Sequence, residues 1–164
     1  MVKIETLIKE GKVSKIKELE LTRYANFFKN SYKDNFEHSK QNTENFPRWS
    51  IISGYYAMHD ITKLFLVKEF RLKIEFEVHS TTIKVLRQLI KDKEILKLID
   101  KGYTEFISLA NDLARAKKDR VKVQYYTGTP YMKEIFRKRS KEFMVNVVIP
   151  YIKKMRKLIG EKND

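Results

Sequence analysis

The sequence predicts an all-α fold, an up-and-down bundle of four to five helices in one domain that spans residues 1–164. The 164 residues include only three prolines and five glycines, so few residues interrupt a helix. Apolar residues recur at steps of three and four, which is the spacing of one helix face. One segment is apolar nearly all round, which is typical of a helix that several others cover.

The first long helix is predicted over residues 13–41. Its apolar positions form one stripe, made of Leu21, Tyr24, Ala25, Phe28, Tyr32 and Phe36. A polar stretch then ends the pattern. Asn45 can cap the next helix, and Pro47 suits its first turn, where an amide hydrogen would have no partner.

The second helix is predicted over residues 48–68 and is the central one. Its apolar residues surround most of the cylinder, and Gly54 and Ala57 allow a neighbour to approach closely. This helix has more apolar surface than three neighbours would cover. Because exposed apolar patches mark interfaces, we expect a homodimer.

Residues 74–78 alternate between apolar and charged side chains, which is the period of a strand. The sequence shows no second strand to pair with, and an isolated strand is unstable. We therefore expect an extended connector that docks on the helices. Ser80 or Thr81 is the expected cap of the short helix that follows, which carries Ile83, Leu86, Leu89 and Ile90.

Two further long helices are predicted over residues 95–118 and 132–159. Gly102 weakens the middle of the first. Pro150 lies inside the second, but the apolar spacing continues past it, so a kink is expected there rather than an end. Gly160 is the expected stop. Residues 119–130 between these helices are less regular and end in a loop signal.

The composition favours an anionic partner. The formal charge is +14, with 35 Lys and Arg residues against 21 Asp and Glu residues. Such a field attracts nucleic acid, anionic lipid or an acidic protein. The alternative is a lysine-rich solvated surface of the kind found in thermophiles.

Several classes of site and location are not expected. The chain has no cysteine, which excludes disulfides and cysteine-based zinc sites. The three histidines lie on different predicted elements without metal-ligand spacing, so we expect no metal and no cofactor. There is no apolar run of about eighteen residues and no signal peptide at the start, so we expect a cytoplasmic protein without membrane contact.

The candidate nucleotide- or RNA-binding site lies at the end of the fourth helix. Five cations are followed by two tyrosines, in the set Arg115, Lys117, Lys118, Arg120, Lys122, Tyr125 and Tyr126. Cations neutralise phosphates, and aromatic rings stack on bases. A solvated basic helix end followed by packed tyrosines explains the same pattern. His59 and His79 are possible accessory residues, either proton carriers or structural groups.

Three segments resemble, in order and spacing, motifs of the HEPN family over roughly residues 19–159. Residues 53–66 are similar to the family's second helix, and residues 79–83 to the start of its short helix, which contains a histidine. The segment from Arg120 to Tyr125 is similar to the motif after its fourth helix, an arginine followed by a tyrosine. The likeness is to prokaryotic, archaeal-type members.

The resemblance implies a dimeric bundle in which R-x4-6-H motifs of two protomers meet, and ribonuclease members cut RNA there without metal. Arg120 matches the arginine, but no histidine follows it, and Tyr125 and Tyr126 stand in that place. Val121 replaces the usual polar neighbour. Tyrosine, with a pKa near 10, is a poor proton carrier at neutral pH.

We therefore expect a dimeric binding module for nucleotide or RNA that is not catalytic. The resemblance adds a possible nucleotidyltransferase partner, as in related toxin–antitoxin pairs where the partner modifies a tyrosine. One alternative is a metal-independent ribonuclease in which Arg120 acts with a substitute proton carrier such as His59. The other is a helical protein-interaction domain without a nucleic-acid role.

Overall fold

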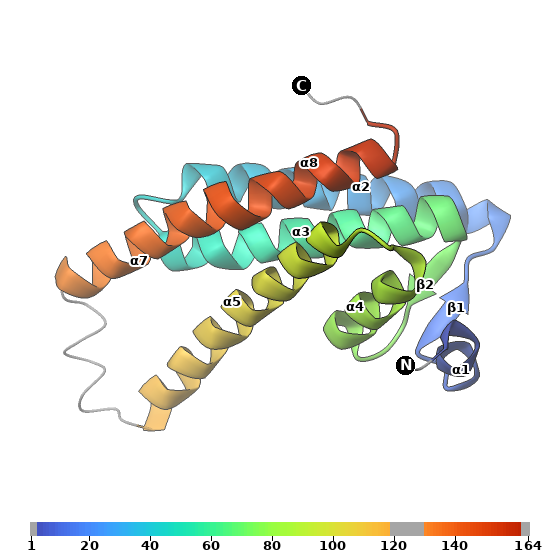
Figure 1. Ribbon diagram of the computed structural model, residues 1–164, viewed down its shortest axis with the longest axis horizontal. Coiled ribbons are helices and arrows are strands. Elements are labelled where there is room, and N and C mark those ends of the chain that lie inside the picture. The colour runs from blue at the N-terminus through green and yellow to red at the C-terminus, as the bar shows by residue number, and fades with distance from the viewer. Residues whose placement is uncertain (1–2, 119–129, 162–164) are drawn as a thin grey trace.

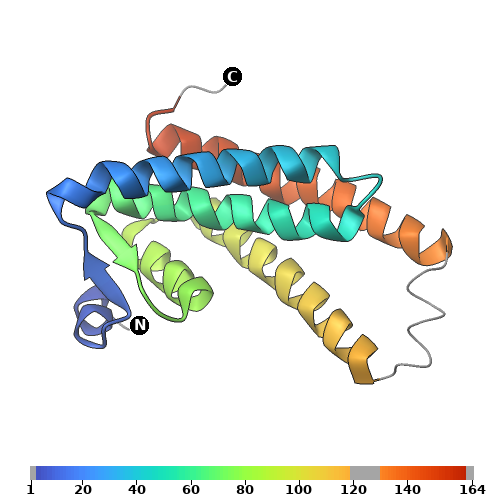
Figure 2. The same ribbon diagram turned by 180° about the vertical axis from the view of Figure 1, so that it is seen from behind.

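The computed structural model describes the backbone of residues 3–118 and 130–161, and the side chains of residues 3–111 and 133–161. Two long helices, α2 (Glu18–Gln41) and α3 (Pro47–Phe70), lie side by side as a hairpin (Figures 1 and 2). The last helical segment, formed by α7 (Pro130–Phe143), η1 (Met144–Val148) and α8 (Ile149–Leu158), packs along the hairpin. The prediction of a mostly helical fold is confirmed.

The remaining long helix, α5 (Lys93–Lys118), starts against α8 and η1 and diverges from α7 (Figure 1). The other end of the molecule holds smaller elements. These are α1 (Ile4–Lys9), β1 (Val13–Lys15), β2 (Leu72–Ile74) and α4 (Val78–Leu89). None of the described helices contains a stretch that is both long and apolar enough to cross a bilayer.

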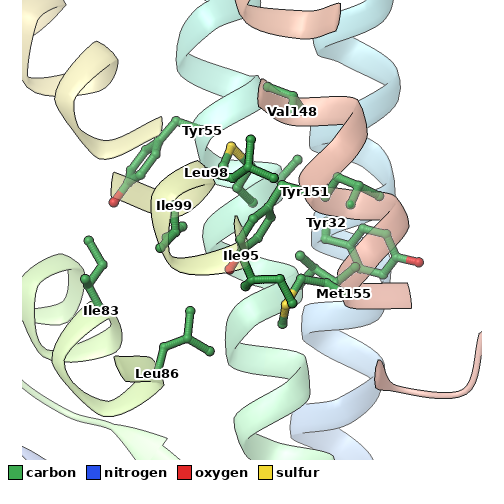
Figure 3. Close-up of a cluster of buried hydrophobic side chains, with 14 of the residues drawn as sticks. Tyr32, Tyr55, Ile83, Leu86, Ile95, Leu98, Ile99, Val148, Tyr151 and Met155 are labelled. Atoms are coloured by element: carbon green, nitrogen blue, oxygen red, sulfur yellow. The ribbon is translucent and has the colours of Figure 1, made fainter. Parts of the chain in front are cut away.

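Helix α3 is the centre of the core, as predicted. Sixteen of its residues are buried, and it contacts α2, α4, α5, α7, η1 and α8. Figure 3 shows how Tyr55 of α3 joins a cluster with Tyr32 of α2, Ile99 of α5 and Tyr151 of α8. The expectation that one chain leaves much of this helix uncovered is wrong, because more elements surround it than the sequence indicated.

The extended segment has a partner, which corrects the prediction of an isolated connector. Strand β2 pairs antiparallel with β1, with Val13 opposite Ile74 and Lys15 opposite Leu72. The predicted first helix is therefore also wrong at its start: residues 13–15 are a strand, and α2 begins at Glu18. A strand pairing across about sixty residues depends on the chain reversal made by α2 and α3, which local periodicity does not reveal.

Three predicted helix starts also need correction. The cap of α3 is Phe46 rather than Asn45, although Pro47 does occupy the first turn. Helix α4 begins at Val78, before Ser80 and Thr81, whose hydroxyls donate hydrogen bonds to the carbonyls of Glu77 and Phe76 instead of accepting one from an amide. Helix α5 begins two residues earlier than predicted. There the Asp92 Oδ1 accepts hydrogen bonds from the amides of residues 94 and 95, at 2.8 and 3.2 Å.

The final helix continues past Pro150, as predicted. Proline lacks the amide hydrogen of a regular turn, and the wider π-helical turn η1 lies directly before it. The helix ends where Gly160 adopts a φ of 69°. The amides of Gly160 and Glu161 then donate to the carbonyls of Lys157 and Arg156, which is the Schellman arrangement that a glycine in this conformation permits.

Candidate functional site

The predicted binding residues fall where the structure describes least. The backbone of α5 includes Arg115, Lys117 and Lys118, but their side chains lie outside the described residues. The remaining four, Arg120, Lys122, Tyr125 and Tyr126, lie wholly outside them. The structure does describe the surfaces of α5 and α7 that face each other across a groove.

A groove of about 810 Å³ lies between the first half of α5 and the segment from α7 to η1. Leu96, Phe143 and Val147 supply its apolar lining, and the other groups are polar or charged. Among the described lining residues, the cations outnumber the carboxylates by five to three: Arg87, Lys93, Lys97, Lys101 and Arg139 against Asp100, Glu105 and Glu142. The volume is within the range of ligand-binding clefts.

Three of these cations form a row along one face of α5. Lys93, Lys97 and Lys101 follow each other at four-residue steps and are exposed. Four residues of helix rise about 6 Å, so the row runs along the groove. None of the three forms an ion pair within the described part of the chain. Their charges are therefore available to a bound anion.

The other charged groups of the groove are arranged differently. Arg87 Nη2 donates to Asp100 Oδ1 at 2.6 Å, and the guanidinium of Arg139 donates to the carboxylate of Glu105. These two pairs offset most of the negative charge in the lining. The Asp100 pair ties α4 to α5, and the Glu105 pair ties α5 to α7, so both help to fix the shape of the groove.

His59 and His79, which lie on different helices, meet inside the fold. Their ring centroids are 4.7 Å apart, and the Tyr55 hydroxyl is hydrogen-bonded to His79 Nδ1 at 2.9 Å. The rings of Tyr55 and Phe106 stack at 4.6 Å beside them. His79 therefore tethers the start of α4 to α3, which agrees with the structural interpretation of this residue.

His59 is only 1% exposed, and neither ring nitrogen has a hydrogen-bond partner. The Val78 backbone lies near enough to favour the protonated ring slightly, but its geometry falls short of a hydrogen bond. Burial, with the nearby charge of Lys63, lowers the pKa of His59 to about 2. Burial also lowers the pKa of His79. Both rings are thus neutral near pH 7.

The carboxylate next to His59 is held by other groups, since its Oδ1 lies 3.9 Å from His59 Nδ1, beyond hydrogen-bond distance. Asp60 accepts hydrogen bonds from Ser31 Oγ at 2.6 Å and Asn35 Nδ2 at 3.2 Å, and Lys63 Nζ lies 3.6 Å away. Burial lowers the pKa of Lys63, although Asp60 opposes that shift. This network joins α2 to α3 and satisfies the buried carboxylate without the imidazole.

Among the described residues, no three His, Asp or Glu side chains converge as metal ligands would. Sequence reasoning missed the groove, although one signal was available. The lysines at positions 93, 97 and 101 have the four-residue spacing of a single helix face. What the sequence lacked was the opposing surface, since Arg139 and Asn146 are about forty residues away along the chain.

In comparisons with protein-family models, with curated proteins and with solved structures, nothing matches this chain.

Proposed function

We propose that this protein is a HEPN-like helical module that binds the phosphates of RNA or a nucleotide in the groove between α5 and α7, without cutting them. The observation that carries the proposal is the row Lys93, Lys97 and Lys101. Exposed lysines without carboxylate partners attract phosphate as point charges. A groove lined by both apolar and charged side chains suits a ligand that has both phosphates and rings.

The order of the helices along the chain agrees with the HEPN-like part of the proposal. In chain order, the short helix α4, which holds His79, follows the α2–α3 hairpin and precedes α5. That is the position of the short helix in the resemblance. The backbone of α5 runs from the groove to Lys118, where the predicted cluster continues with Arg120. We propose that the groove and this cluster bind one ligand.

The histidines support binding rather than turnover. Metal-free cleavage needs a group that exchanges a proton near neutral pH. His59 is buried with a pKa of about 2, and His79 is hydrogen-bonded to Tyr55. Neither environment suits a proton carrier for a ligand in the groove. Incubation of the protein with mixed RNA in the presence of a chelator should therefore leave the RNA uncut. Cleavage by the wild-type protein that Arg120→Ala abolishes would show that the protein is a ribonuclease instead.

The binding proposal is tested by charge reversal. Lys97→Glu places a carboxylate in the middle of the row and should weaken the binding of a fluorescein-labelled, mixed-sequence RNA about tenfold or more. Lys33→Glu is the matched control, because it makes the same charge change at an exposed position of α2. Fluorescence anisotropy at low salt measures both affinities.

Equal losses for the two variants would mean that only net charge matters and that the groove is not the site. Absence of binding by the wild-type protein at low salt would remove nucleic acid from its function altogether. Circular dichroism would show that both variants keep the helical fold.

A further inference from the structure

The turn between α2 and α3 presents two large aromatic side chains to solvent. Phe46 is 59% exposed and Trp49, the chain's only tryptophan, is 60% exposed. Their exposure follows from the first turn of α3, where Pro47, Ser50 and Ile51 face the core. Positions 46 and 49 lie on the other side of that turn. No ring of another described residue packs against either of them.

These two residues line a second pocket, of about 250 Å³, beside the first half of α7. The other lining residues are Asn45, Pro47, Arg48, Lys133 and Phe136. Phe136 is largely buried, and the Arg48 guanidinium lies 5.6 Å from its ring centroid. The pocket thus combines exposed rings, a buried ring and two cations.

The cations of this pocket have no carboxylate partner in the described part of the chain. Arg48 contacts the Phe136 ring, and Lys133 is exposed. Acidic residues are near, but they are already paired: Glu134 with Arg137, and Glu44 with Lys141. The local charge available to a ligand is therefore positive, as it is in the groove.

We propose that this pocket takes an unpaired nucleobase of single-stranded RNA, with Trp49 as the stacking surface and Arg48 and Lys133 beside the adjoining phosphates. The inference rests on the proposed function and adds the class of RNA. The pocket is smaller than the roughly 300–1,000 Å³ of clefts that hold drug-sized ligands, so it suits one ring system. Unpaired bases are available for such stacking, whereas those of a duplex are not.

The position of the pocket supports one ligand for both sites. Phe136 lines the pocket and Phe143 lines the groove, and both lie on α7. Seven residues of helix rise about 10 Å, so a short single strand spans both. The cations of this pocket also favour a polyanion there over the same surface of a second copy, which would present the same two cations.

The test uses the fluorescence of the single tryptophan. Titration with a single-stranded oligoribonucleotide should quench Trp49 emission, because a stacked base contacts the indole. A duplex of the same sequence should quench much less, and AMP should quench only at far higher concentration because it lacks the other phosphates. Emission that single-stranded RNA leaves unchanged while anisotropy shows it bound would overturn the base site.

Variants that leave the charge of the protein unchanged separate the effect of stacking from an effect on folding. Trp49→Ala should weaken the binding of single-stranded RNA about tenfold or more, while Trp49→Phe, which keeps a ring, should retain most of the affinity. Phe27→Ala is the matched control, since Phe27 is an exposed aromatic residue of α2. Thermal unfolding by circular dichroism should be unchanged in all three, because both side chains lie mainly in solvent.

Undiminished RNA binding by Trp49→Ala would refute the base site and leave the groove proposal intact. Failure of the wild-type protein to bind any RNA at low salt would refute both. If Trp49→Ala instead abolishes self-association in sedimentation and leaves RNA affinity unchanged, the aromatic surface is a contact between copies of the chain and the base site is wrong.

Discussion

At the scale of single residues, His59 shows how a buried polar group without a partner affects stability. A buried donor or acceptor that lacks a hydrogen bond costs about 1–3 kcal/mol, and both nitrogens of this ring lack one. The surrounding rings of Tyr55, His79 and Phe106 pack the cluster tightly. The imidazole therefore acts as a packing element that stays neutral.

We predict that the free energy of unfolding falls as the pH drops below about 6.5. The pKa of His59 is about 2 in the folded protein against 6.5 for a free histidine, so between these values only the unfolded chain takes up the proton. Each pH unit in that window costs about 1.4 kcal/mol, or roughly 2 kcal/mol between pH 6.5 and 5. Urea denaturation at several pH values measures this slope.

His59→Leu should remove that part of the slope and leave the protein at least as stable at pH 7, because an apolar side chain needs no partner. His79, whose pKa burial also lowers, acts in the same direction and keeps part of the dependence. A slope in His59→Leu equal to that of the wild type would mean that His59 is protonated in the folded protein.

At the scale of elements, two glycines mark close helix contacts of different kinds. A Cβ on Gly54 of α3 would lie 2.9 Å from Ser39 Oγ and 3.0 Å from a methyl group of Val148. Ser39 cannot move easily, since its hydroxyl donates to the carbonyl of Ser50 at 2.7 Å. A Cβ on Gly102 of α5 would lie 2.8 Å from the terminal methyl of Met58, a flexible side chain.

We therefore predict opposite outcomes for the two alanine variants. Gly54→Ala should lower the free energy of unfolding by about 1–3 kcal/mol, because overpacking forces α2, α3 and η1 apart. Gly102→Ala should lie within about 1 kcal/mol of the wild type, because the helix propensity of alanine offsets the shift of Met58. Urea denaturation of both variants measures which one loses more free energy of unfolding. A larger loss for Gly102→Ala than for Gly54→Ala would contradict the prediction.

At the scale of the whole molecule, the positive charge governs encounters with other polyelectrolytes. We predict that affinity for single-stranded RNA falls on the order of tenfold between about 50 and 200 mM salt if three phosphates are neutralised. Lys97→Gln should flatten the plot of log affinity against log salt by about 0.7, the contribution of one phosphate. Lys33→Gln should leave the slope unchanged, and an equal change in both variants would point to diffuse attraction only.

Self-association is the second prediction at this scale. The core of the described chain covers α3, so a dimer would use other apolar side chains that lie in solvent, such as Phe76 and Val145. Sedimentation at micromolar concentration should give a mass twice the 19.7 kDa of one chain. Monomer alone at that concentration would contradict the prediction.

The helices could be predicted from the sequence, whereas much of the candidate site could not. Pro47, Gly160 and the apolar run of α3 act on neighbouring residues, so their effects could be predicted. Asp92 was also a local signal, because an acidic side chain at this position can accept a hydrogen bond from the amide two residues later and so cap the helix. The sequence prediction did not include this cap. The groove could not be predicted because nearly half of its described lining residues come from elements other than α5, namely α4, α7 and η1, and the last two are distant from α5 along the chain.

By itself, the sequence determined the helical class, the central position of α3 and the excess of positive charge, because composition and periodicity act over a few residues. Only the tertiary structure decided that residues 13–15 form a strand with residues 72–74. It alone brought His59 to His79 and set the lysines of α5 opposite α7. The physical reason is that each of these contacts requires the chain to reverse first, and where the reversals bring two segments together depends on the packing of the whole core.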